Sequence, residues 1–177
     1  ARLDEAGSPG LYGGTERVVS WLTEELVRQG HQVTLFASGD SETSAKLVPS
    51  VARGLRLAGI RDHTASTLVM LDQVHRRANE FDIIHFHVDL LHFPIFQNLF
   101  QKCVTTLHGR PDLPDFHPIY RAFPKMPLVS ISDEQRGPMP PSLNWMATID
   151  HGLPANLYRF NQKGGSYLAF LGRIAPE

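Results

Sequence analysis

The fold is decided by residues 15–37, which read TERVVSWLTEELVRQGHQVTLFA. The first part of this stretch predicts a helix that begins at Thr15, a suitable N-cap, and stops at Gly30. Its apolar residues recur at the spacing of one helix face: they are Val18, Val19, Leu22, Leu26 and Val27. The second part, residues 31–37, is rich in β-forming residues and predicts a strand. A helix followed closely by such a strand indicates a parallel sheet.

The same order occurs twice more along the chain. A helical composition at residues 66–78 precedes a strand-like run at residues 81–87. Residues 90–99 precede another run, at residues 103–107, in the same way. Further strands are expected at residues 128–132, 145–149 and 167–171. Three helix-to-strand alternations predict an α/β fold, a Rossmann-like three-layer sandwich with a mostly parallel sheet.

Two segments interrupt this pattern. Residues 1–12 contain no strand-like run, although a sheet of this class normally opens with a strand. Residues 161–166 are polar, contain two glycines and are the best linker candidate in the chain. The sequence therefore predicts one compact domain that ends before this linker.

The composition limits the classes of function. Among 177 residues, 17 Lys and Arg nearly balance 18 Asp and Glu, so the formal net charge is −1. This balance provides no large positive field for nucleic acid, and we expect no nucleic-acid partner. The single cysteine, Cys103, has no partner for an internal disulfide, which fits a reducing compartment. Because the sequence also lacks a long apolar run and a signal-peptide pattern, we expect a cytoplasmic protein.

Two glycines, Gly13 and Gly14, stand immediately before the first predicted helix. The unpaired N–H groups and the dipole of a helix N-terminus can hold a phosphate, and glycines let a ligand approach the backbone closely. The alternative is a tight loop that only starts the helix. The spacing matches neither a P-loop nor a full dinucleotide-binding motif.

Three polar residues at alternate positions, His85, His87 and Asp89, share one face of a predicted strand and its extension. Such a set could bind zinc, and it resembles the His-x-His-x-Asp-His motif of metallo-β-lactamase-fold hydrolases. That motif needs a histidine directly after the aspartate, where this sequence has Leu90. The other interpretation is that these residues face a ligand cleft at the carboxyl edge of a parallel sheet. A zinc-dependent hydrolase is therefore one alternative function.

Two further residues follow predicted strands. His108 comes directly after the run at residues 103–107, where an imidazole can hydrogen-bond a sugar hydroxyl or assist proton transfer. Arg173 follows the run at residues 167–171, where a guanidinium can clamp a diphosphate through parallel hydrogen bonds. The order of all these motifs carries more information than any one of them.

Taken in order, six segments of the chain resemble family-4 glycosyltransferases: Tyr12–Arg17, Gly30–Ala37, Thr106–Gly109, Val129–Ser132, His151–Pro154 and Phe170–Ile174. The resemblance implies a GT-B fold, in which two Rossmann-like domains face a cleft and the N-terminal one holds the acceptor. It makes residues 1–160 the acceptor-side domain and residues 161–166 the linker. Residues 167–177 would then be the first strand of a donor-binding domain.

The resemblance also implies a reaction and the residues that carry it. The family transfers a sugar from a nucleotide-diphosphate sugar to an acceptor hydroxyl, with retention of anomeric configuration and without a metal or other cofactor. The catalytic residue in contact with the transferred sugar would be His108. The donor phosphates would be bound by Gly13, Gly14 and Arg173. The acceptor would be bound by Thr15, Asp89 and Arg110.

Some features of the family lie outside this sequence or differ from it. The lysine that partners Arg173 would fall at position 178, and a Glu-x7-Glu motif lies deeper in the second domain. We therefore expect the chain alone to have no useful transferase activity. Many relatives carry Asn-Gly where this sequence has His151 and Gly152, so no role of that asparagine passes to His151.

Other expectations concern partners and a further class of function. The expected partners are a nucleotide sugar and a small-molecule, lipid or glycan acceptor. Homodimerisation and peripheral membrane contact of the full enzyme are compatible with this interpretation. A non-catalytic sugar- or nucleotide-binding module is a third hypothesis.

Overall fold

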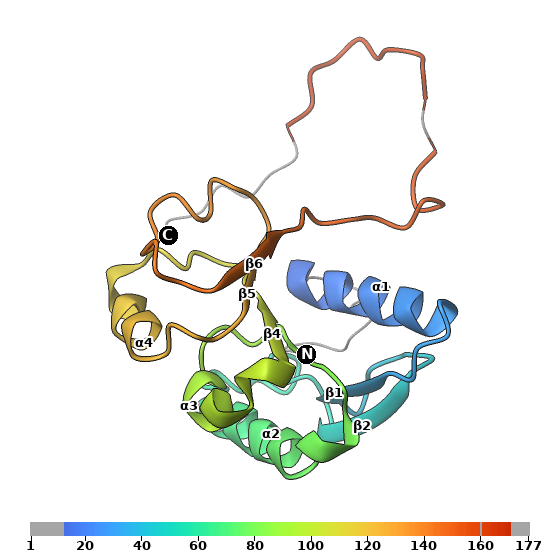
Figure 1. Cartoon of the computed structure of the whole chain (residues 1–177). Coiled ribbons are helices and arrows are strands. Elements are labelled where there is room, and N and C mark those ends of the chain that lie inside the picture. The colour runs from blue at the N-terminus through green and yellow to red at the C-terminus, as the bar shows by residue number, and fades with distance from the viewer. Residues whose placement is uncertain (1–12, 160, 171–177) are drawn as a thin grey trace.

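The computed structural model describes residues 13–159 and 161–170 and shows alternating helices and strands (Figure 1). The α-helices are α1 (Gly14–Arg28), α2 (Thr64–Arg76), α3 (Phe93–Phe96) and α4 (His117–Ala122). The strands are β1 (Thr34–Ser38), β2 (Lys46–Val51), β3 (Ile84–Phe86), β4 (Cys103–Thr106), β5 (Leu128–Ser130) and β6 (Trp145–Thr148). Short 3₁₀ turns are η1 (Ala78–Glu80), η2 (Gln97–Lys102) and η3 (Pro114–Phe116). The predicted α/β class is confirmed, and no helix among the described residues is long and apolar enough to cross a membrane.

Within the part of the chain that the structure describes, the strands form two parallel sheets, whereas the sequence predicts one mostly parallel sheet. One sheet pairs β1 with β2, and the other has the order β3-β4-β5-β6, with every neighbouring pair parallel. Residues of β1, β3, α1 and α2 line an open cavity of about 1230 Å³ between the two sheets.

The helix α2 shows why the sequence folds as it does locally. Its buried residues are Thr67, Met70, Leu71 and Val74, which recur at the spacing of one helix face. Leu71 is fully buried in the main core cluster. Burying one such side chain stabilises the fold by about 1.5–3 kcal/mol relative to leaving it exposed.

Aromatic side chains join β3 to α3. The ring centroid of Phe86 lies 3.9 Å from that of His92, in a stacked arrangement, and 4.8 Å from that of Phe96. His92 and Phe96 are fully buried. These contacts fix the end of β3, from which His87 follows directly.

The helix α1 begins one residue earlier than the sequence predicts. Gly13 is the N-cap, with φ 146°, and no side chain of the described residues caps the helix, so the expectation that Thr15 is the N-cap is wrong. Glycine adopts this backbone conformation without the steric cost that a side chain would add. The predicted stop is confirmed: Gly30 has φ 91°, and the His31 N–H donates to the Leu26 carbonyl at 3.1 Å.

Two elements differ in extent from the prediction. The strand expected at residues 31–37 starts at Thr34, because residues 31–33, which follow the turn at residues 29–30, belong to no helix or strand. The helix expected at residues 90–99 is only the short α3, followed by η2. Such 3₁₀ turns are common where a helix gives way to a connector.

The strand expected at residues 167–171 is not formed over residues 167–170, and Leu171 lies outside the described residues. Tyr167, Leu168 and Phe170 are all exposed. A strand satisfies its backbone groups through a neighbouring strand, and the described residues supply none here. The linker at residues 161–166 and the proposed domain division stay predictions.

Candidate functional site

The candidate site lies at the carboxyl edge of the four-stranded sheet. His87 directly follows β3, and His108 follows β4 after one intervening residue. His151 comes shortly after β6. Because neighbouring parallel strands end at the same edge, residues far apart in the sequence meet there, as ligand-binding residues do in open α/β sheets.

Three histidines at this edge form what we call the imidazole chain: His87, His108 and His151. His87 Nδ1 lies 2.8 Å from His108 Nε2, and His108 Nδ1 lies 3.0 Å from His151 Nε2. The rings are stacked, with centroids 5.1 Å apart in the first pair and 5.2 Å apart in the second. Both nitrogens of the central ring therefore have an imidazole partner.

The two ends of the imidazole chain have different environments. His87 is only 5% exposed, and burial lowers its pKa well below the usual value, with further lowering from neighbouring imidazoles. His87 is therefore neutral at neutral pH. His151 is exposed. The chain thus runs from a buried neutral ring to a ring that solvent and ligands can reach.

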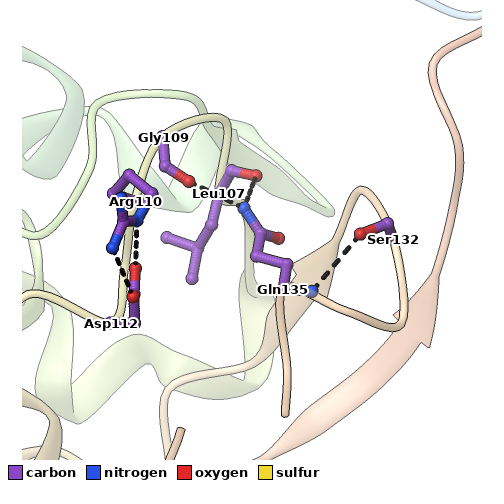
Figure 2. Close-up of polar contacts among 6 residues, drawn as sticks. All are labelled: Leu107, Gly109, Arg110, Asp112, Ser132 and Gln135. Atoms are coloured by element: carbon purple, nitrogen blue, oxygen red, sulfur yellow. Dashed lines mark hydrogen bonds and ion pairs between the residues drawn. The ribbon is translucent and has the colours of Figure 1, made fainter. Parts of the chain in front are cut away.

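A glutamine fixes the loop that carries His108 (Figure 2). Gln135 Nε2 donates to the carbonyl oxygens of Leu107 at 3.1 Å and Gly109 at 3.0 Å. Its Oε1 accepts a hydrogen bond from the Ile131 N–H at 3.1 Å. One side chain thus joins the loop after β4 to the loop after β5 on both sides of His108. Sequence reasoning missed Gln135, since a glutamine after a strand has no specific signal.

Arg110, expected to bind the acceptor, is held by a neighbouring carboxylate. Its Nε and Nη2 donate to the two oxygens of Asp112 at 2.7 and 2.8 Å (Figure 2). The hydrogen bond from Arg110 lowers the pKa of Asp112. The Arg110 side chain is 56% exposed, so it lies at the surface of the loop. An acceptor contact by Arg110 stays a prediction.

The start of α1 is where the sequence predicts that the donor phosphates bind. A Cβ atom added at Gly14 would meet nothing within 4 Å among the described residues, and Gly14 is exposed. Thr15 lies in the first turn and is half-buried. The roles of Gly13 and Gly14 at the donor phosphates and of Thr15 at the acceptor stay predictions. Arg173 lies outside the described residues.

The zinc site suggested by the sequence is not formed. Within residues 13–159 and 161–170, no group of three or more His, Cys, Asp or Glu residues is placed to hold a metal ion. His85 Nε2 lies 2.8 Å from Thr106 Oγ1, while His87 contacts His108. The backbone of Asp89 has φ 44°. Burial raises the pKa of Tyr120, and the negative charge of Asp89 raises it further. The carboxylate is therefore near Tyr120, and alternation along the strand does not continue through it.

Comparison with known proteins identifies a family for this chain. The family model described as Glycosyltransferase Family 4 matches residues 12–133, which is more than half of the chain. The matched range includes the first two members of the imidazole chain, whereas His151 lies beyond it. No curated protein matches the sequence.

Proposed function

Because the chain belongs to glycosyltransferase family 4, we propose that it is the acceptor-side domain of an enzyme that uses a nucleotide-diphosphate sugar. This enzyme transfers a hexose to an acceptor hydroxyl with retention of anomeric configuration. The observation that carries the proposal is the position of His108 at the carboxyl edge of the parallel sheet, inside the matched range.

His108 is the proposed catalytic residue. An imidazole can hydrogen-bond a hydroxyl of the transferred sugar and exchange a proton with it. Its loop is fixed by the two hydrogen bonds from Gln135 and its ring by two imidazole partners. A group held in this way is oriented before the substrate arrives, which lowers the entropic cost of reaching the transition state.

The proposed donor contacts come from the start of α1 and from Arg173. Backbone N–H groups at Gly13 and Gly14 would face the diphosphate, in keeping with the exposed position of Gly14. Arg173 and the lysine of a following domain would stabilise the negative charge on the leaving nucleotide. In this proposal, cationic side chains replace a divalent metal ion at the diphosphate. The acceptor contacts would come from Thr15, Asp89 and Arg110.

The test is an assay of sugar transfer and of nucleotide-sugar hydrolysis. It compares the 177-residue chain with the same chain joined to a donor-binding domain, each with added zinc and with a chelator. The proposal predicts transfer only by the two-domain enzyme, with the same rate in zinc and in chelator. Hydrolysis by the single chain that requires zinc would contradict it. Sugar binding without turnover by the two-domain enzyme would instead indicate a non-catalytic binding module.

A further inference from the structure

The central feature of the site is that both ring nitrogens of His108 contact another histidine of the imidazole chain. Its Nε2 contacts His87 and its Nδ1 contacts His151, at 2.8 and 3.0 Å. Both distances are those of ordinary hydrogen bonds between nitrogens, so one proton must lie in each contact. A ring held at both nitrogens can neither rotate nor exchange its proton independently of its neighbours.

The protonation states of three neutral rings are therefore coupled. If His87 carries its proton on Nδ1, then His108 and His151 must also carry theirs on Nδ1. If His151 donates from Nε2, then all three rings carry the proton on Nε2. A neutral imidazole has one donor and one acceptor nitrogen, so no mixed arrangement makes both hydrogen bonds. When an additional proton is held by His108, its ring can donate to both neutral neighbours at once.

We propose that His87 and His151 are positioning residues for His108, which hold its ring through both nitrogens and select its tautomer. This inference rests on the proposed function only in that His108 is the group that contacts the sugar. His87 serves as the fixed inner partner, because it is 5% exposed and packed at the end of β3. His151 serves as the outer partner, because it is exposed.

The difference between the two partners leads to different kinetic effects. A substrate hydroxyl that binds His108 takes the place of His151 at Nδ1, since the buried His87 cannot leave Nε2. Loss of His87 therefore removes a contact that persists through the reaction and lowers kcat. Loss of His151 removes a group that the sugar hydroxyl must displace, so it alters the KM for the nucleotide sugar more than it alters kcat.

The direct test is nitrogen-15 NMR of the histidine rings in the 177-residue chain. The wild-type protein should show one protonated and one unprotonated nitrogen for His108, with shifts typical of a single tautomer. His87→Ala and His151→Ala should each give averaged shifts for the His108 ring. His31→Ala is the matched control, because His31 is exposed and no hydrogen bond or ring contact with the imidazole chain is found for it in the described residues. Averaged shifts in the wild type, or unchanged His108 shifts in both variants, would overturn the proposal.

Conservative variants separate positioning from a general effect on folding. The amide of asparagine can reach the position of an imidazole Nδ1, so His87→Asn should restore much of what His87→Ala loses. The longer glutamine reaches the position of Nε2, so His151→Gln should restore the single tautomer and His151→Asn should not. His151 is exposed, so its variants keep the test informative even if His87→Ala fails to fold.

Kinetic measurements on the two-domain enzyme complete the test. We expect His87→Ala to lower kcat about tenfold, the effect of one lost hydrogen bond to the reacting group, with rescue by His87→Asn. We expect His151→Ala to change mainly the KM for the nucleotide sugar. If His87→Ala and His87→Asn lose kcat equally, the proposal that His87 positions the His108 ring is contradicted. An enzyme without transferase activity would refute the proposed function, while the NMR result would still decide whether the imidazole chain holds His108.

Discussion

Substitution of Gln135 by glutamate tests how the loop that carries His108 is held. The two side chains have nearly the same shape, and both offer an oxygen to the Ile131 N–H. The glutamate lacks the amide that donates to Leu107 and Gly109, at 3.1 and 3.0 Å. In its place, a charged oxygen faces two carbonyl oxygens.

The expected loss can be worked from these contacts. Each hydrogen bond contributes about 1 kcal/mol of net stability, so two lost bonds cost about 2 kcal/mol. Repulsion between the carboxylate and the two carbonyl groups adds to this loss. We therefore expect Gln135→Glu to lower the free energy of unfolding by about 2–3 kcal/mol at pH 7.

The assay is urea unfolding followed by tryptophan fluorescence, since Trp21 and Trp145 report on α1 and β6. The matched control is Gln101→Glu, which makes the same charge change at an exposed position in η2 and should change stability by less than about 0.5 kcal/mol. Hydrogen exchange should also become faster in the loop after β4. A Gln135→Glu variant as stable as the control would refute the reasoning.

Three further predictions concern the core beneath the site. Thr105→Val removes the hydroxyl that lies 2.8 Å from His92 Nε2, and because both residues are fully buried, urea unfolding should show a loss of about 1–3 kcal/mol. Burial lowers the pKa of His92 to about 3 from 6.5, so the unfolded chain binds a proton that the folded chain does not. The stability from neutral His92 is complete above pH 6.5 and is lost as the pH falls toward 3, and His92→Gln should flatten this dependence in unfolding curves at pH 7 and 5. Burial raises the pKa of Cys103 to about 11, so a thiol reagent at pH 8 should modify it slowly in buffer and rapidly in urea, whereas equal rates would contradict its burial.

Part of the fold and of the site follows from local sequence patterns. The runs around β4 and β5 are apolar and rich in β-branched residues, so their strands are predicted from residues 103–107 and 128–132. The position of His108 at the carboxyl edge follows from its place after one of these strands. The stop of α1 follows from Gly30, because a positive φ at a helix end favours glycine.

Other features depend on contacts between distant segments, which no local pattern reports. His108 meets His87 and His151 only because β3, β4 and β6 end at one edge of the sheet. The alternation that grouped His85, His87 and Asp89 fails because the backbone of Asp89 turns to φ 44° after the strand. The role of Gln135 likewise depends on carbonyl groups more than 25 residues earlier in the chain.

The most direct measurement of the central claim is sugar transfer by the two-domain enzyme, comparing wild type with His108→Ala and with the control His31→Ala. Labelled sugar on the acceptor and the anomeric configuration of the product are read together. The account predicts transfer with retention by the wild type and by His31→Ala, and about 100-fold lower kcat for His108→Ala. No transfer from any nucleotide-diphosphate sugar, or equal turnover by His108→Ala, would contradict it.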